Sequence, residues 1–327
     1  MLSIFSQLAD WLIFSIAGLS PELKLAQSLH FFVEDTSKIF VLLIVMIYFV
    51  ALIRASLNVE RVRDYLVNKH KAIGYFLGSL FGAITPFCSC SSIPVFLGFT
   101  SAGIPVGITM AFLLTSPLIN EVAILLLIGL VGWEITLIYI FIGMIIGTLG
   151  GVFLDLIHAE KYLQPFALKA YQRAKAPKDK PEAAVRMSFK ERHQFAKQEA
   201  FDIFNRVWIW VFIGVGLGAA LHGFVPETWF ASHLGGNVWW SVPLATIVGI
   251  PLYSNAMGII PIMDSLIVKG LPLGTTMAFC MSTVAASFPE FILLKQVMQW
   301  KLLMIIFLML LTAFTLVGWV LNFIYVA

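Results

Sequence analysis

Charged residues are scarce in this chain: Asp, Glu, Lys and Arg make up 12% of its 327 residues, whereas hydrophobic residues make up 60%. A soluble domain carries roughly 25% charged residues, so this low content excludes an ordinary water-soluble globular protein. It also leaves no large basic surface of the kind that nucleic-acid binding requires. We therefore predict an all-α polytopic membrane protein that is surrounded by the lipid bilayer and has no nucleic-acid partner.

Cysteines and metal-binding patterns are scarce as well. The three cysteines, Cys88, Cys90 and Cys280, are too few for a disulfide framework. The sequence has no run rich in His or carboxylates, so we predict no metal site and no cofactor. No Lys or Arg precedes the first apolar stretch, unlike a secretory signal, and residues 1–35 are predicted to form a retained helix and a connection.

Long apolar runs are abundant by contrast, and most are long enough to cross the hydrocarbon layer of a bilayer. Two basic loops, 57–71 and 158–203, are short enough for the positive-inside rule and are predicted to face the cytoplasm. The predicted apolar segments are 4–19, 36–56, 73–99, 104–130, 135–157, 205–224, 240–263, 271–294 and 302–326.

The sequence also contains an internal repeat at an offset of 167 residues. Residues 103–112 match residues 270–279 at seven of ten positions, with Gly, Pro and Thr in register. Chance similarity between two apolar helices would not keep these residue types aligned. We therefore predict two transmembrane repeats, 36–157 and 204–327, joined by the basic loop 158–203.

The two basic loops constrain how the chain crosses between them. Three crossings, by 73–99, 104–130 and 135–157, would place the loops on opposite faces, against the charge rule. One segment is therefore predicted to enter and leave by the same face, and 73–99 is favoured because prolines, glycines and a polar run interrupt it. Its repeat partner, 240–263, is interrupted likewise. The predicted plan is an inverted repeat whose discontinuous or re-entrant helices meet near the midplane. The predicted structural breaks are Pro86, Pro94, Pro117, Pro251, Pro261 and Pro289.

A polar turn with two thiols interrupts the third apolar segment. Cys88 and Cys90 alternate there with Ser89, Ser91 and Ser92. Lipid does not tolerate an irregular polar backbone unless protein or a water-filled cavity surrounds it, so the turn is predicted to line a pocket. Thiolates select soft, thiophilic species. The alternative is that both cysteines are small buried residues that pack a tight turn.

Five further residues are candidates for the same pocket. Cys280 follows the second copy of the repeat motif and either completes a three-sulfur site or packs its helix. Ser254 and Asn255 mirror the cysteine turn and are predicted to be pocket walls or packing residues. Glu121 and Glu290 occupy matching places in the two repeats. Carboxylates deep in a bilayer are costly and functional by default, so they are predicted to couple transport to protons or, alternatively, to cap broken helices.

The motifs at 85–94, 103–107, 115–121 and 287–290 together resemble a bacterial permease family that includes the trivalent organoarsenical efflux permeases. The resemblance runs from about residue 36 to the end of the chain. It implies a transporter rather than an enzyme, located in the bacterial cytoplasmic (inner) membrane. For the characterised members it implies export of trivalent organoarsenicals through cysteine thiols, which by position points to Cys88 and Cys90.

The sequence thus predicts a permease that exports a small thiophilic solute by alternating access, with trivalent organoarsenicals as the best candidate. Two alternatives stay open: a permease for another solute with structural cysteines, and a membrane thiol–disulfide oxidoreductase that uses Cys88 and Cys90. The spacing of these two cysteines is not that of a Cys-x-x-Cys redox pair, which argues against the oxidoreductase. A homo-oligomer is compatible with the sequence, which does not specify one.

Overall fold

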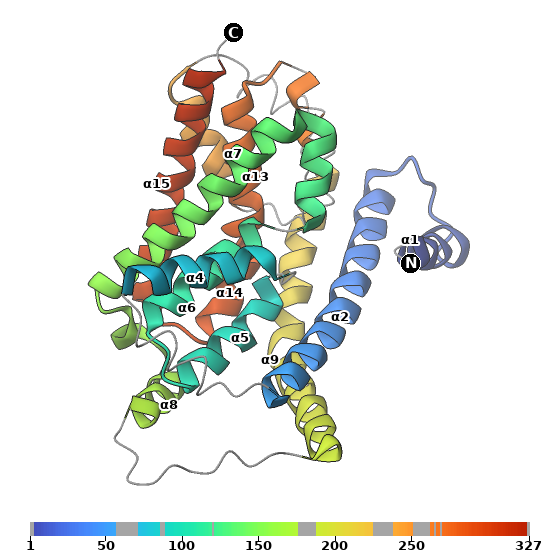
Figure 1. Cartoon of the computed structure of the whole chain (residues 1–327). Coiled ribbons are helices and arrows are strands. Elements are labelled where there is room, and N and C mark those ends of the chain that lie inside the picture. Colours follow the sequence, from blue (N-terminus) through green and yellow to red (C-terminus); the bar gives the residue numbers. More distant parts are fainter. Residues whose placement is uncertain are drawn as a thin grey trace. The chain divides into compact units, whose positions relative to one another are not determined.

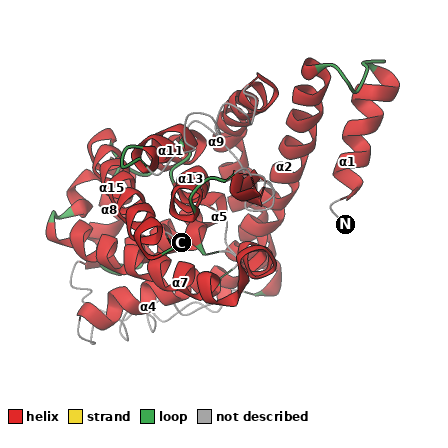
Figure 2. Cartoon of the chain, turned by 90° about the horizontal axis from the view of Figure 1, so that it is seen from above, coloured by secondary structure: helices red, strands yellow, loops and turns green. Residues whose placement is uncertain are grey.

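The computed structural model of the chain is built from helices (Figure 2). It describes residues 3–56, 71–85, 89–119, 121–175, 188–224, 238–250, 262–264, 266–268 and 270–325. Within these ranges there is no β-strand, and one antiparallel bridge pairs Leu163 with Met298. The predicted all-α fold class is therefore confirmed for the described part of the chain.

The helices divide between two compact units. The first unit comprises residues 1–44, 204–292 and 310–327, and the second comprises residues 45–203 and 293–309. Helices within the second unit are α4 (Lys71–Ile84), α5 (Ser89–Ser101), α6 (Val106–Leu118), α7 (Glu121–Leu156), the short η2 (Ala159–Tyr162) and α8 (Pro165–Lys175). Helices within the first unit are α1 (Ser3–Asp10), the π-helix η1 (Trp11–Ile16), α11 (Ser241–Gly249) and α13 (Leu273–Ala285). Helices that contribute to both are α2 (Lys24–Ser56), α9 (Phe189–Phe224), α14 (Phe288–Lys295) and α15 (Trp300–Ile324).

Two helical stretches in the described ranges are long and apolar enough to cross a membrane, Leu127–Leu156 and Trp300–Ile324. Several other apolar helices are much shorter. At 1.5 Å per residue, the 14 residues of α4 and the 13 of α6 each extend only about 20 Å. The hydrocarbon layer is about 30 Å thick, so neither helix could cross it alone.

The break predicted within residues 73–99 corresponds to a division between two helices. α4 ends at Ile84, Thr85 forms a bend, and α5 begins at Ser89. Breaks were also predicted at Pro117 within 104–130 and at Pro289 within 271–294, and both segments are divided between two helices in the structure. α6 ends at Leu118 before α7 begins, and α13 ends at Ala285 before α14 begins. In α6 the physical cause is Pro117, which lacks an N–H and whose ring crowds the carbonyl one turn earlier.

The predicted boundary between 104–130 and 135–157 is a kink rather than a loop. Gly132 adopts φ 84° and ψ 170° inside α7, and helix continues on both sides of it. A residue with a Cβ rarely adopts this backbone conformation, so glycine is required at this point.

Glycine contacts hold the core of the second unit together. Small residues allow membrane helices to approach until their backbones touch. A Cβ added to Gly78 would lie 2.6 Å from the Ile108 carbonyl oxygen, so α4 lies directly on α6. A Cβ added to Gly151 of α7 would lie 2.5 Å from the Gly107 carbonyl oxygen, so α7 approaches α6 just as closely.

The same local features recur in the first unit at the offset of 167 residues. α13 spans the residues equivalent to α6, and the preceding Gly270 has φ 86° where Gly103 has φ 82°. Gly274 and Gly318 meet as Gly107 and Gly151 do. The sequence repeat therefore corresponds to a repeated local structure, whereas the inverted orientation of the repeats and their division at 36–157 and 204–327 stay predictions.

Candidate functional site

Helices α4 and α5 run in opposite directions, and we call this pair the hairpin (Figure 1). α4 lies parallel to α6, because Gly78 packs on Ile108 and Gly82 packs on Phe112. α5 lies antiparallel to α6, because the two helices are joined by a tight turn at Gly103 and Ser92 of α5 bonds to Ser116 of α6. The end of α4 and the start of α5 therefore form the tip of the hairpin, and the cysteine turn lies between them in the sequence.

Buried hydroxyl groups join the hairpin to its neighbours just below the tip. The Ser92 and Ser116 hydroxyls are 2.9 Å apart, and both side chains are fully buried. The Ser79 hydroxyl of α4 lies 2.8 Å from the Thr115 hydroxyl and donates to the Met144 carbonyl of α7 at 3.1 Å. Buried hydroxyls need partners because an unpaired one loses its bonds to water. The four hydroxyls thus fix both arms of the hairpin against α6 and α7.

The structure describes the predicted cysteine turn only in part. Pro86 and Cys88 lie outside the described residues. Ser89, Cys90, Ser91 and Pro94 belong to α5 by their backbone, and their side chains are outside the description. Among the predicted pocket residues of this turn, Ser92 has a described side chain, which is buried and lies against Ser116 of α6.

Glu121 begins α7 at the end of α6, which is the same end of the α5–α6 pair as the start of α5. The backbone thus brings the beginning of α7 to the level of the hairpin tip, while the Glu121 side chain lies outside the description. Tyr139 of α7 donates a hydrogen bond to the Leu118 carbonyl at the end of α6. This bond anchors the end of α6, where the chain turns into α7.

The remaining predicted residues lie in the first unit. Cys280 is a free, buried thiol in the middle of α13, and Glu290 is buried in the first turn of α14, where it is 6% exposed. Pro289 belongs to α14 by its backbone alone. Pro251, Ser254, Asn255 and Pro261 fall outside the described residues. Whether Cys280 approaches the cysteine turn therefore stays a prediction.

The buried hydroxyl residues of the second unit have equivalents in the first unit. Thr246, Ser282 and Thr283 occupy the positions of Ser79, Thr115 and Ser116 and are fully buried. Each bonds to a carbonyl of its own helix: Thr246 to Val242, and Ser282 and Thr283 to Phe279. Thr115 likewise bonds to the Ala111 carbonyl of its own helix, so hydroxyl bonds within a helix are common to both units.

A second polar site lies at the base of the hairpin, far along α4 from its tip. The Tyr75 hydroxyl donates to Asp155 at 2.6 Å, and the Lys71 ammonium lies 3.5 Å from the same carboxylate oxygen. The Lys71 side chain is 78% exposed, which leaves this ion pair open to solvent screening. These contacts link the first turns of α4 to the last turns of α7.

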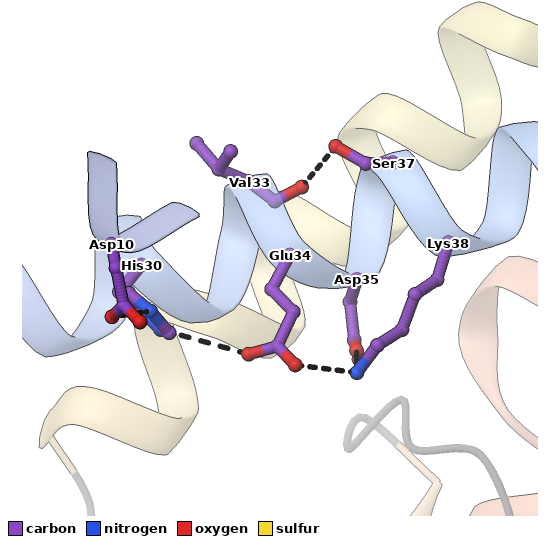
Figure 3. Close-up of polar contacts among 7 residues, drawn as sticks. All are labelled: Asp10, His30, Val33, Glu34, Asp35, Ser37 and Lys38. Atoms are coloured by element: carbon purple, nitrogen blue, oxygen red, sulfur yellow. Dashed lines mark hydrogen bonds and ion pairs between the residues drawn. The ribbon is translucent and has the colours of Figure 1, made fainter. Parts of the chain in front are cut away.

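A charged chain on α2 is a site that the sequence analysis missed (Figure 3). His30 Nε2 lies 2.9 Å from Asp10 of α1, and His30 Nδ1 lies 3.6 Å from Glu34. Glu34 in turn lies 2.6 Å from Lys38, which is 3.8 Å from Asp35. The signal was present in the sequence, because Glu34 and Lys38 are four residues apart, a spacing that places two side chains on one face of a helix. Glu34 and Lys38 lie where the apolar stretch of α2 begins, and the contact between His30 and Asp10 links α2 to α1.

The structure holds no grouping of His, Cys, Asp and Glu in its described ranges that could bind a metal ion.

A family model described as ArsP_1, predicted permease, matches residues 24–323. Among curated proteins, the chain is 23% identical over 280 residues to the UPF0718 protein MJ0584 of Methanocaldococcus jannaschii, which covers 71% of this chain and 77% of that protein. It is 24% identical over 274 residues to the UPF0718 protein YraQ of Escherichia coli, covering 79% of this chain and 74% of that protein. Among solved structures none gives a significant match.

Proposed function

Because the chain belongs to this predicted permease family, we propose that it exports a small thiophilic solute across the cytoplasmic membrane by alternating access. Trivalent organoarsenicals are the solutes that fit the cysteine turn best, since their arsenic atom is soft and prefers sulfur ligands. The family points to a transporter rather than an enzyme and does not specify the substrate.

The observation that carries the proposal is the hairpin formed by α4 and α5. Each arm is about 20 Å long, so a hairpin that starts at one face of the bilayer ends within the hydrocarbon layer. Its tip is the place in the sequence where two cysteines and three serines stand together. Irregular polar backbone at that depth must face protein or a water-filled cavity. A solute pocket at the tip meets this requirement.

The local structure supports a role for Cys88 and Cys90 in such a pocket. α5 begins at Ser89, so Cys88 and Cys90 flank the first residue of a helix, at the end where the helix dipole is positive. The bond between Ser92 and Ser116 fixes the first turn of α5 against α6. A rigid support of this kind reduces the conformational entropy that a binding turn would lose on capturing its ligand.

Proton coupling would release a solute that the thiols hold tightly. Glu121 begins α7 at the level of the hairpin tip, and Glu290 is buried in the first turn of α14. A proton delivered to a thiolate weakens its bond to arsenic, so carboxylates that gain and lose protons during transport could control release. Ser254, Asn255 and Cys280 would complete the pocket from the second repeat if the two repeats are inverted and meet at the midplane.

The test is accumulation of a trivalent methylarsenical in everted membrane vesicles that contain the full chain, with and without an imposed pH gradient. We expect wild-type vesicles to accumulate the arsenical, and Cys88→Ser and Cys90→Ser each to reduce accumulation at least tenfold while the protein stays inserted. Ser101→Ala, an exposed change at the base of the hairpin, is the matched control and should transport normally.

Two outcomes would redirect the proposal. Normal transport after replacement of all three cysteines would assign the chain to a solute that does not need thiols. A purified protein whose count of free thiols changes reversibly with the redox potential, without transport in vesicles, would favour the oxidoreductase. A dependence on the pH gradient that disappears in Glu121→Gln or Glu290→Gln would support proton coupling.

A further inference from the structure

Helix α8 has two different faces. One face is buried: Ala167 is 1% exposed, Tyr171 is 4% exposed, and Ala174 packs on the turn after α5, where a Cβ added to Gly103 would lie 3.2 Å from the Ala174 Cβ. The opposite face is exposed and carries Lys169, Gln172 and Arg173. Phe166 stands at its beginning and is 48% exposed. Hydrophobic contacts therefore fix α8 to the base of the hairpin and leave its cations directed outward.

Hydrogen bonds fix the beginning of α8 as firmly. The Gln164 backbone N–H donates to the Val297 carbonyl at 2.8 Å, and its side chain donates to the carbonyls of Lys295 and Met298. Gln299 donates two further bonds: its backbone N–H donates to the Tyr162 carbonyl, and its side-chain amide donates to the Leu163 carbonyl. We call this set of bonds the glutamine clasp. Since α8 is held at both ends, its exposed face occupies one fixed position on the second unit.

The charge on and around this face has one sign. Residues 161–175 contain Lys161, Lys169, Arg173 and Lys175 and no acidic residue. The nearest acid in the sequence, Glu160, lies 3.3 Å from the ring of His158. An exposed aromatic side chain beside a row of cations suits the boundary between lipid headgroups and acyl chains. The complementary surface is the anionic cytoplasmic leaflet, whose attraction for basic residues falls off within a Debye length of about 8–10 Å.

We propose that the exposed face of α8 binds anionic phospholipid headgroups of the cytoplasmic leaflet. Lys169 and Arg173 contact lipid phosphates, and Phe166 enters the boundary beneath them. The proposal rests on the chain being a membrane permease with its 158–203 loop in the cytoplasm, and it is independent of the transported solute. Its test measures lipid binding alone, so it can fail while transport of the arsenical is retained, and the reverse.

The experiment uses the purified full chain in a neutral detergent, with phosphatidylglycerol or phosphatidylcholine added at increasing concentration. Lipid that stays bound is counted by native mass spectrometry. We expect the wild-type protein to prefer phosphatidylglycerol. Each basic residue near an anionic surface contributes about fivefold in affinity, so the double variant Lys169→Gln, Arg173→Gln should bind phosphatidylglycerol about 25-fold more weakly.

The matched control is the double variant Lys190→Gln, Lys197→Gln, which removes two exposed cations from the first turns of α9 in the same basic loop. It should stay within twofold of wild type. Equal retention of the two lipids by the wild-type protein would overturn the proposal. So would an equal loss of affinity in both double variants, because the attraction would then come from net charge rather than from α8. Unchanged lipid affinity in Lys169→Gln, Arg173→Gln would assign the face to a different partner.

Discussion

At the scale of single residues, close packing depends on glycines whose Cβ positions are already occupied. Gly151 of α7 meets both the Gly107 carbonyl oxygen and the Ala111 Cβ of α6. Gly129, earlier in the same helix, has nothing within 4 Å of its Cβ position. One helix therefore contains a glycine that is required for packing and another that is not.

We expect Gly151→Ala to destabilise the protein by about 1–3 kcal/mol, because the added methyl group forces two helices apart. The measurement is the melting temperature of the purified protein in detergent. Gly129→Ala is the control and should be neutral or up to about 1 kcal/mol stabilising, because alanine is the better helix former. Equal melting temperatures for the two variants would contradict the close contact between α6 and α7.

Side-chain contacts between different helices are the feature that the sequence did not reveal. Ser92 was predicted to line a pocket because it stands beside two cysteines, and its contact with Ser116 was not predicted. The partner lies 24 residues away on another helix, and periodicity in one segment cannot identify such a contact. The ion pairs of Glu34 and Lys38 were detectable, because both residues lie on one helix.

At the scale of helices, the hairpin shows what proline and glycine patterns can predict. The interruption of residues 73–99 was placed correctly, since helix formers give way there to proline and serine. Proline was also the signal for the breaks predicted at Pro117 and Pro289, near which α6 ends at Leu118 and α14 begins at Phe288. Apolar composition predicts burial in lipid, and it does not reveal whether the helix continues.

Labelling from each side of the membrane tests whether the hairpin is re-entrant. Ala72 and Ser101 are exposed residues at the beginning of α4 and the end of α5. In a chain whose native cysteines are replaced by serine, we expect Ala72→Cys and Ser101→Cys both to react with a membrane-impermeant maleimide from the cytoplasmic side. Labelling of the two positions from opposite sides would mean that α4 and α5 together cross the membrane.

At the scale of the whole molecule, the duplication is expressed in repeated glycine contacts and helix bounds. Both α6 and α13 begin after a proline that follows a glycine with positive φ, and both have 13 residues. Identity at seven of ten positions was enough to predict this correspondence, because glycine and proline directly specify backbone conformation. The orientation of the repeats depends on crossings elsewhere in the chain, which local similarity does not determine.

The repeat supplies its own test of that orientation. Val268 is 80% exposed and occupies the position equivalent to Ser101. If the repeats are inverted, Val268→Cys should react with the impermeant maleimide from outside the cell, whereas Ser101→Cys reacts from the cytoplasm. Reaction of both from the cytoplasm would instead indicate parallel repeats.

The glutamine clasp has a consequence for the order in which the protein is made. It joins residues that are 134 and 136 positions apart in the chain. A ribosome that adds about 5–20 residues per second needs on the order of ten seconds to travel from one partner to the other. During that interval α8 has already been synthesised, whereas residues 295–298, whose carbonyls accept the bonds from Gln164, have not. The end of the second unit where α8 packs is therefore completed late in translation, well after the residues of the hairpin have been synthesised.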